Sequence, residues 1–377
     1  MQKAQPLSDK ASRVARVLED AGLDALVAAG PENAIYLSGA YNPVRRLILE
    51  RPAIVLWPRD AAPVLLAAAI EEAFLRERSA IADVRTYAGA TEAAVAALGT
   101  VLRERGLARV RIGLDLGHVS AQLYRMLQRV VPDAEIADAT SLLGRLRAIK
   151  SAPEIEALRE AAQATDRAEW EALGEFRVGW TEADLGVRLR QALIGQGAET
   201  VAFLILGGGR RGVAAHATPA DVPLRPGELL RFDMGGLFHG WASDVAKTAA
   251  VGAPTDGQRR AYRTLRRILD DHIARLRPGA VPEELYASVA ADFERAGLGL
   301  RAPHVGHGIG LGVHESPLLA PGERTPIQAD MVLCAEVIHV EGEEERYHLE
   351  ELVHVGHDGP QVVSRSRPAP EAIPVIG

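Results

Sequence analysis

The sequence predicts a protein in two parts: an α/β sandwich with a mixed sheet comes first, and a larger α+β part follows it. The chain has 377 residues, more than one ordinary hydrophobic core supports. Strand-like and helix-like segments alternate over roughly the first 145 residues. In the remainder, helical segments are interleaved with strands that read as antiparallel. We therefore expect two domains, residues 1–150 and residues 151–377, of which the second is α+β.

Composition and charge narrow the class of partner. The apolar fraction of 47% and the charged fraction of 25% are typical of a soluble globular protein. A net charge of -7 and a pI near 5.9 argue against a surface that coats nucleic acid or an anionic membrane. The single cysteine, Cys334, excludes an internal disulfide, and the start MQKAQPLSDK lacks the apolar core of a signal peptide. No run of about 20 apolar residues is present, so we expect a cytoplasmic protein that binds a peptide or a small molecule.

The first part is predicted to begin with a helix and to continue with alternating strands and helices. Residues 8–22 carry an apolar stripe and end at a glycine, which indicates a helix. Strand-like runs follow at 25–29, 53–57, 64–68 and 111–116. Predicted helices separate these strands at residues 70–78, 91–105 and 120–130. No catalytic constellation is visible here, and we interpret His118 and the aspartates of this part as surface or capping residues.

The second part begins with a helix signal at its first residues. Ser151-Ala-Pro-Glu154 has the pattern of a capping box with proline in the first turn, and it predicts a long helix to about Phe176. A second helix is expected from Thr181 to about Gly195, and strand 201–206 ends at three glycines that do not form a phosphate-binding loop. The remaining predicted elements are helices 256–276 and 282–296, strands 303–314, 331–340 and 347–355, and a loosely ordered proline-rich tail after Pro360.

Two aspartates lie within a largely apolar segment, residues 231–247, with the sequence RFDMGGLFHGWASDVAK. Apolar runs on both sides of its glycine pair predict a β-hairpin, in which antiparallel strands can bring Asp233 and Asp244 side by side. Two anions placed in this way repel each other unless a positive charge lies between them. The rest of the chain must therefore supply either further metal ligands or basic residues for ion pairs.

A second group of polar residues lies toward the C-terminus, where seven of the eleven histidines fall between His304 and His357. Glycines flank His307 and let the backbone pack closely around its ring. Glu336 and Glu350 lie within apolar segments that are predicted to be strands. Burial of an unpaired carboxylate in such a strand costs free energy of folding. Two divalent cations would balance the charge of these four carboxylates, and ligation by oxygen with one imidazole suits Mn, Co, Zn or Fe(II). Taken singly, each residue also fits a structural role, as a turn residue, a packed histidine or a partner of arginine.

In order and spacing these residues resemble the pita-bread metallopeptidase family, M24, which includes methionine aminopeptidase, aminopeptidase P, prolidase and creatinase. The matching text is DMG with a second aspartate eleven residues later in SDVAKT, then GHGIGLGVHESP, VLCAEVIHV and HLEELVHV. The resemblance implies that Asp233 holds one metal ion and that Asp244 and Glu350 bridge two. It implies that His307 and Glu336 complete the ligands of the other ion.

The resemblance extends over nearly the whole chain. His216 in AHATP and His314 are similar to the two substrate-facing histidines of aminopeptidase P and prolidase, and Glu336 is similar to a proton shuttle. The text GLDALVAAGPENAIYLSGA is similar to the creatinase/prolidase N-terminal domain. The implied fold is a smaller α/β creatinase-type domain followed by a pita-bread catalytic domain, and relatives imply a homodimer.

Three positions depart from the pattern of the family. Val337 stands where proline is usual, and His348 and Lys247 stand where arginine is common. His304 lies three residues before His307, whereas relatives commonly show a histidine four residues before, so no role is assigned to it. We interpret the three departures as positions that influence the substrate.

The resemblance implies a dinuclear metal-dependent peptidase, with Mn as the expected metal and Co, Zn or Fe as alternatives. It would hydrolyse Xaa-Pro or similar bonds in dipeptides or short peptides through a metal-bridging hydroxide. One alternative is a metal-dependent C–N hydrolase or lyase of the same fold that acts on a small non-peptide metabolite. A non-catalytic binding protein is a further alternative.

Overall fold

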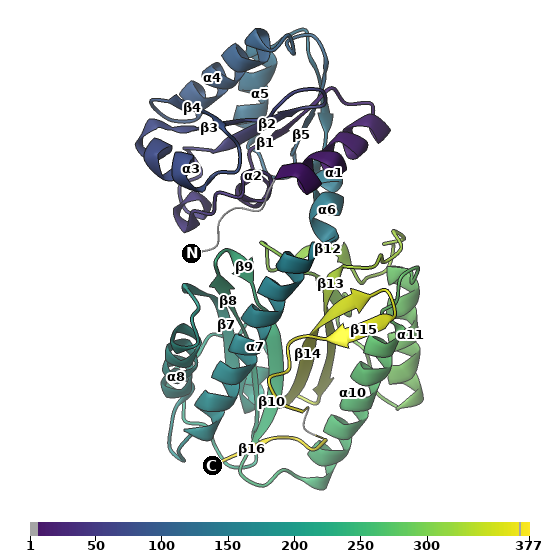
Figure 1. Cartoon of the computed structure of the whole chain (residues 1–377). Coiled ribbons are helices and arrows are strands. Elements are labelled where there is room, and N and C mark those ends of the chain that lie inside the picture. The colour runs from purple at the N-terminus through teal and green to yellow at the C-terminus, as the bar shows by residue number, and fades with distance from the viewer. Residues whose placement is uncertain (1–6, 369–370) are drawn as a thin grey trace. The chain divides into compact units, whose positions relative to one another are not determined.

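The chain folds into two compact units, whose boundary lies between Arg147 and Ala148 (Figure 1). The structure is a computed structural model that describes residues 7–368 and 371–377. Helix α6 (Thr140–Ala148) ends the first unit, and helix α7 (Ala152–Gly174) begins the second. Each unit has buried hydrophobic clusters of its own.

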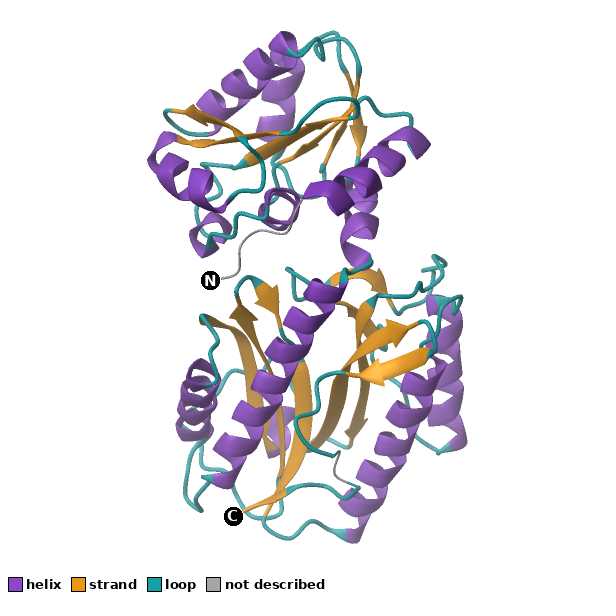
Figure 2. Cartoon of the chain, viewed as in Figure 1, coloured by secondary structure: helices purple, strands orange, loops and turns teal. Residues whose placement is uncertain are grey.

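The N-terminal unit is a six-stranded mixed sheet in the order β4-β3-β2-β1-β5-β6, with helices around it (Figure 2). Strand β2 pairs antiparallel with β1 and β3, and the other neighbours are parallel. The strands are β1 (Ala25–Ala28), β2 (Ile54–Pro58), β3 (Val64–Ala68), β4 (Asp83–Tyr87), β5 (Arg111–Leu114) and β6 (Glu135–Asp138). The helices are α1 (Leu7–Asp20), α2 (Pro31–Ser38), α3 (Glu72–Arg78), α4 (Thr91–Glu104), α5 (Ala121–Val130) and α6, with 3-10 turns η1 (Pro43–Arg46) and η2 (Ala69–Glu71).

The predicted α/β sandwich with a mixed sheet is confirmed, although two of its strands and two of its α-helices were not expected. Strands β4 and β6 form the two edges of the sheet and carry exposed polar residues, so neither shows an apolar run in the sequence. Helices α2 and α6 are short and lack a clear apolar stripe. The buried central strands, by contrast, are apolar throughout, because both of their faces are covered.

Of the two roles expected for the aspartates of this unit, at the surface or as a cap, Asp115 takes the second, although it is buried. It follows β5 and is 0% exposed. Its carboxylate accepts hydrogen bonds from the backbone N–H groups of Ala29 and Gly30 and from Asn33 Nδ2. Burial raises the pKa of Asp115, and the three donors act in the opposite direction. Asp115 therefore caps the start of α2 from inside the core.

Replacing Asp115 with alanine is expected to destabilise the protein by about 2–4 kcal/mol, because three buried donors lose a shared acceptor. Urea unfolding followed by circular dichroism measures this loss. Asp133→Ala is the matched control, since Asp133 pairs with Arg109 at the exposed surface and its loss should cost less than about 1 kcal/mol. Equal losses for the two variants would contradict the buried capping role.

The C-terminal unit consists of two five-stranded sheets with helices packed against them (Figure 1). One sheet has the order β16-β10-β8-β7, with β9 paired to β8, and the other has the order β12-β11-β13-β14-β15. The sheets meet where β8 and β10 contact β14. The strands are β7 (Thr200–Gly208), β8 (Leu229–Phe238), β9 (Trp241–Ala242), β10 (Val245–Val251), β11 (Gly306–Gly308), β12 (Glu315–Leu318), β13 (Val332–Glu341), β14 (Glu345–Gly356), β15 (Gly359–Val362) and β16 (Val375–Ile376). The helices are α7, α8 (Glu182–Gly195), α9 (Gly209–Gly212), α10 (Asp256–Arg275) and α11 (Pro282–Arg295).

Two apolar clusters attach the helices to these sheets. One joins α7 and α8 to β7, β8 and β10 and includes Phe232. The other joins α10 and α11 to β13 and β14 and includes Leu269 and Phe293. Because side chains alternate along a strand, β8 directs Phe232 toward the helices and Asp233 toward the opposite, inner face. The α+β class predicted for this part is confirmed.

The main helices of this unit begin at capping boxes that are encoded in the local sequence. Capping boxes with Ser151 and Glu154, with Thr181 and Asp184, and with Thr255 and Gln258 precede α7, α8 and α10. The predicted capping box at the start of α7 is thereby confirmed. The predicted strand 303–314 forms only in part, as β11, because a glycine-rich turn separates it from β12.

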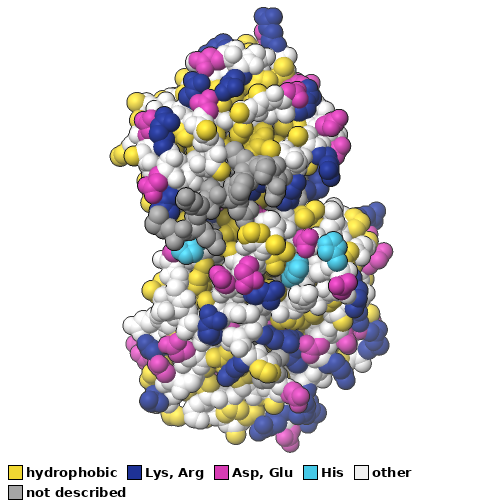
Figure 3. Space-filling view, viewed as in Figure 1, with side chains coloured by type: hydrophobic (Ala, Val, Ile, Leu, Met, Phe, Trp, Pro, Cys, Tyr) yellow, Lys and Arg dark blue, Asp and Glu magenta, His cyan; other side chains and the backbone are white. Residues whose placement is uncertain are grey.

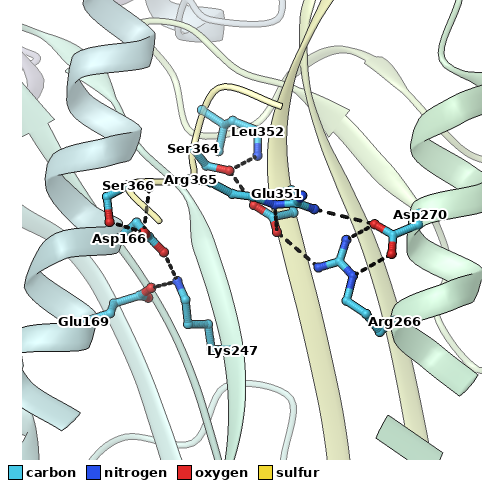
Figure 4. Close-up of polar contacts among 10 residues, drawn as sticks. All are labelled: Asp166, Glu169, Lys247, Arg266, Asp270, Glu351, Leu352, Ser364, Arg365 and Ser366. Carbon is cyan, nitrogen blue, oxygen red and sulfur yellow. Dashed lines mark hydrogen bonds and ion pairs between the residues drawn. The ribbon is translucent and has the colours of Figure 1, made fainter. Parts of the chain in front are cut away.

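The expectation of a loosely ordered tail is wrong for its described residues. Strand β15 pairs with β14, and β16 pairs in parallel with β10. Between them, Ser364 Oγ donates to Glu351, and the backbone N–H of Ser366 donates to Asp166 of α7 (Figure 4). These partners lie far away in the sequence, so a proline-rich composition gives no sign of them.

The surface and the helices carry two further features. Acidic and basic side chains are interspersed on the face shown in Figure 3. No helix within residues 7–368 and 371–377 has the length and apolar character needed to cross a membrane.

Candidate metal centre

Four carboxylates and one imidazole meet on the inner faces of the two sheets. Asp233 lies in β8, and Asp244 directly precedes β10, the antiparallel partner of β8. Glu336 of β13 and Glu350 of β14 lie opposite each other in the strand register, and His307 lies in β11 beside β13. All five side chains are buried. The structure therefore brings together the five residues that were predicted to bind metal.

Glycines place the His307 ring, as the sequence predicted. Gly306 has a φ of +145°, and a Cβ atom there would lie 2.1 Å from the carbonyl oxygen of Cys334. A Cβ atom at Gly308 would lie 2.4 Å from the carbonyl oxygen of Ser316. His307 Nδ1 lies 3.0 Å from the carbonyl oxygen of Gly308, which can only accept, so Nδ1 carries the proton. The lone pair of Nε2 is then directed toward the acids, as in a metal-binding histidine.

The ligand atoms form two groups that share Glu350. Each group offers atoms within 4.8 Å of one another: Asp244, His307, Cys334 and Glu350 in one, and Asp233, His348 and Glu350 in the other. His307 Nε2 lies 3.6 Å from Asp244 Oδ2 and 3.8 Å from Glu350 Oε1. His348 Nε2 lies 3.7 Å from Glu350 Oε2. Glu350 thus presents one oxygen to each group.

Burial dominates the electrostatics of three of the acids. It raises the pKa of Asp233, and it raises the pKa values of Asp244 and Glu350 well above the ordinary range, with further increases from the neighbouring carboxylates. Like charges this close in a dry interior cannot all be ionised without compensation. Protons or cations must therefore balance this cluster.

Glu336 is held in the ionised form by two histidines. Burial opposes its ionisation, but contacts with His304 and His348 outweigh burial and lower the pKa of Glu336. His304 Nδ1 lies 2.9 Å from Glu336 Oε1, and His348 Nε2 lies 3.0 Å from Glu336 Oε2. His304, to which the sequence assigned no role, is therefore a partner of Glu336. Burial lowers the pKa of His307 to about 4, so its ring is neutral at neutral pH and suited to metal binding.

This donor set fits a divalent metal site. Asp233 Oδ1 and Glu350 Oε1 are buried and accept no hydrogen bond within the described part of the chain. The alternative of ion pairs with basic side chains explains little. Arg231 Nη2 lies 3.6 Å from Asp233 Oδ2, but among the described residues no lysine or arginine pairs with Asp244 or Glu350.

The histidines predicted to face the substrate are exposed beside this cluster. The His314 ring stacks on His307, with ring centroids 3.7 Å apart. Burial lowers the pKa of His314, and His304 and His216 lower it further. The centre thus has an accessible side lined by imidazoles.

Comparison with known proteins assigns the chain to a family. The model described as metallopeptidase family M24 matches residues 156–357, and the model of the creatinase/prolidase N-terminal domain matches residues 10–149. The chain belongs to metallopeptidase family M24. Its fold is therefore the pita-bread domain preceded by a creatinase-type N-terminal domain, as the resemblance implied.

Individual relatives of this M24 protein are dipeptidases by name. A probable dipeptidase PepE of Mycobacterium tuberculosis is 36% identical over 201 residues, which cover 52% of this chain and 53% of that protein. The chain is thus matched to about half the length of that relative. A Lactobacillus helveticus Xaa-Pro dipeptidase is 32% identical, over 59% of this chain and 62% of that protein. The solved Xaa-Pro dipeptidase of Bacillus anthracis has a TM-score of 0.87 at 22% identity, over 98% of this chain and 99% of that one, and shows the same fold.

Two members of this M24 centre were missed as possible ligands. His348 was noted only as a departure, and Cys334 only as an unpaired cysteine. Burial raises the pKa of the Cys334 thiol well above its usual value, and the nearby carboxylates of Glu350, Asp244 and Glu336 raise it further. Alternation along β13 and β14 was the available signal, because Cys334 precedes Glu336 by two residues and His348 precedes Glu350 by two.

The side chains of the other two departures have their partners on the outer faces of the sheets, away from the acids of the centre. Lys247 Nζ lies 2.6 Å from Asp166 Oδ1 and also pairs with Glu169 of α7 (Figure 4). Val337 is buried in the cluster with α10 and α11. Of the three positions interpreted as influences on the substrate, only His348 contacts the metal centre.

Gly308→Ala is expected to weaken divalent metal binding by about 10- to 100-fold, because a displaced backbone misplaces the His307 ring. Isothermal titration calorimetry with Mn or Zn measures the affinity. Gly312→Ala is the matched control, since a Cβ atom there meets only ordinary contacts of 3.5 Å. Equal affinities for parent and Gly308→Ala would show that the close backbone approach is unimportant.

Metal binding to this M24 protein is expected to release protons. The raised folded-state pKa values of Asp244 and Glu350 stabilise the metal-free protein at low pH, and this stability is lost as pH rises through the raised values. Metal affinity should therefore increase with pH. Calorimetry near neutral pH in two buffers of different ionisation enthalpy counts the protons, and Asp244→Asn should release fewer. Identical heats in both buffers would rule out the release.

Proposed function

We propose that this chain is a dinuclear metal-dependent peptidase that hydrolyses Xaa-Pro or similar bonds in dipeptides or short peptides. The observation that carries the proposal is the pair of buried ligand groups that share Glu350. The name of the Lactobacillus helveticus relative, Xaa-Pro dipeptidase, supports this substrate class. A homodimer is part of the same proposal, and light scattering in solution tests it.

In this proposal Asp233 holds one metal ion, and Asp244 and Glu350 bind both ions. His307 and Glu336 complete the ligands of the second ion. The unpaired oxygens of Asp233 and Glu350 and the free lone pair of His307 Nε2 support these assignments. Mn suits such an oxygen-rich set, and Co, Zn or Fe suit it as well. When bound, the two ions would lower the pKa of a water molecule and polarise the scissile carbonyl.

Glu336 is proposed to move the proton of the reaction. As a carboxylate it can accept a proton from the attacking water and pass it to the leaving amine. Its lowered pKa supports the carboxylate form at neutral pH. The contacts of its two oxygens with His304 and His348 hold the side chain in one orientation.

His216 and His314 are proposed to position the substrate and stabilise the oxyanion. Both side chains are exposed, and the His314 ring lies against His307 of the cluster. The lowered pKa of His314 favours a neutral imidazole, which can donate a hydrogen bond to the developing negative charge. Its stacking on His307 fixes the ring plane relative to the acids.

A substrate panel tests the proposed reaction. Protein reconstituted with Mn, Co or Zn should release proline from Xaa-Pro dipeptides or cleave longer Xaa-Pro peptides, and metal-free protein should not. Xaa-Ala dipeptides are the matched control substrates. No turnover of any peptide with any of these metals would end the peptidase proposal, and turnover of a small non-peptide amide would favour the C–N hydrolase. Bound metal without any turnover would favour a binding protein.

Asp244→Ala is expected to lower both metal affinity and peptidase activity by more than about 100-fold, since even outer partners of a metal ligand contribute 10- to 100-fold. Elemental analysis and a proline-release assay measure the two losses, and circular dichroism checks the fold. Asp270→Ala is the control, because Asp270 pairs with Arg266 of the same helix, α10. Full activity in Asp244→Ala would remove Asp244 from the site.

A further inference from the structure

Arg231 links two parts of the candidate site that lie far apart in the sequence. It precedes Asp233 by two residues in β8, so both side chains point to the inner face, and it is 2% exposed. Arg231 Nη2 lies 3.2 Å from His348 Nδ1 and 3.6 Å from Asp233 Oδ2. Arg231 Nη1 donates to the backbone carbonyls of Ala214 and Ala215, at 3.4 Å and 2.8 Å. One guanidinium therefore contacts both the acidic cluster and the segment that leads into His216.

The contact between Arg231 and His348 determines which atoms donate and which accept in the hydrogen bonds from Arg231 through His348 to Glu336. A guanidinium can only donate, so His348 Nδ1 must accept and the ring proton lies on Nε2. His348 Nε2 lies 3.0 Å from Glu336 Oε2 and donates to it. The backbone of His348 is fixed as well, because its N–H donates to Thr248 Oγ1. Arg231 thus contacts one nitrogen of the His348 ring, and the other nitrogen of the same ring contacts Glu336.

The hydrogen bonds of Arg231 Nη1 hold a segment without regular secondary structure. Residues 213–216 follow the single turn of α9 and end at the exposed His216. Arg346 of β14 donates to the carbonyl of Val213 at 3.0 Å, so two arginines hold three successive carbonyls. A guanidinium is planar and rigid, which means that its two ends keep a constant separation. The guanidinium therefore keeps the carbonyls of Ala214 and Ala215 at a constant distance from the His348 ring.

We propose that Arg231 is a positioning residue that orients Glu336 through His348 and, with the same side chain, holds the segment before His216 at a set distance from the metal centre. The effect of Arg231 on catalysis rests on the proposed function. The hydrogen bonds that define it are independent of the substrate.

Arg231→Lys is the informative variant, because it keeps the charge and removes the planar fork. Hydrogen exchange of the metal-loaded protein, read by mass spectrometry, should speed up by about tenfold over residues 213–217, since local opening loses a hydrogen bond. Exchange in β13 should not change. Arg266→Lys is the matched control, because Arg266 is a second buried arginine and binds Glu351 and Asp270 instead (Figure 4). Unchanged exchange over residues 213–217 in Arg231→Lys would overturn the proposal.

Nitrogen NMR of the histidine rings tests the other end of the linkage. In the parent protein the His348 ring should carry its proton on Nε2, and its signal is assigned by its loss in His348→Gln. Arg231→Met keeps the aliphatic part of the side chain and removes the guanidinium donor. In this variant the form of His348 with its proton on Nδ1 should appear. A parent ring with the proton on Nδ1 would overturn the hydrogen-bond chain, whatever the protein's activity.

A double-mutant cycle connects the linkage to catalysis. Arg231→Lys is expected to lower kcat/KM by about 10- to 100-fold, as for other residues that act through a functional group. In a His216→Ala background the same substitution should cost markedly less, because part of its effect acts through His216. Fully additive losses would overturn the link to His216. If the parent cleaves no peptide, the proposed function fails, and the exchange and NMR experiments still decide the role of Arg231.

Discussion

The mutual repulsion of four buried carboxylates is the constraint that shapes the C-terminal unit. Asp233, Asp244, Glu336 and Glu350 come from both sheets and lie in an interior from which water is largely excluded. The free energy of ionising them all there is high, so the pKa values of Asp244 and Glu350 are raised, and two histidines contact Glu336. Divalent cations provide a better balance, because each neutralises two carboxylates without occupying the oxygens with protons. The apolar helix packing on the outer faces holds the acids together against this repulsion.

The opposite face of the same strands shows how this fold treats acids that are not available to a metal. Glu351 follows Glu350 in β14 but points outward, where Arg266 Nη1 lies at 3.1 Å and Arg365 Nε at 2.8 Å (Figure 4). Lys247 in β10 likewise lies between two acids of α7. Basic side chains therefore neutralise the outer acids, whereas the inner acids have mainly histidines beside them, together with Arg231. This difference between the two faces, more than the number of acids, distinguishes the centre from a structural ion-pair network.

The C-terminal tail belongs to the same outer layer. Ser364 and Arg365 bind Glu351, and Ser366 binds Asp166, so the tail connects the strand that carries Glu350 to helix α7. Strand β16 then adds to the edge of β10. Residues with no chemical role in the centre thus connect the two sheets that carry its acids.

Features that neighbouring residues encode could be read from the chain alone. The capping box of Ser151 and Glu154 and the buried central strands involve short stretches with a regular period. The order of four acids and one imidazole along the chain suggested the metal site. Contacts between distant segments could not be read in this way. His348 meets Arg231 across 117 positions, and Asp115 meets Gly30 across 85, and neither pair leaves a local pattern. Edge strands such as β4 and the tail were missed for the same reason, because their partners, not their own composition, order them. Local physics sets which residues can form a helix, a strand or a ligand pair, and only the packed sheets determine which charges end up sharing one interior.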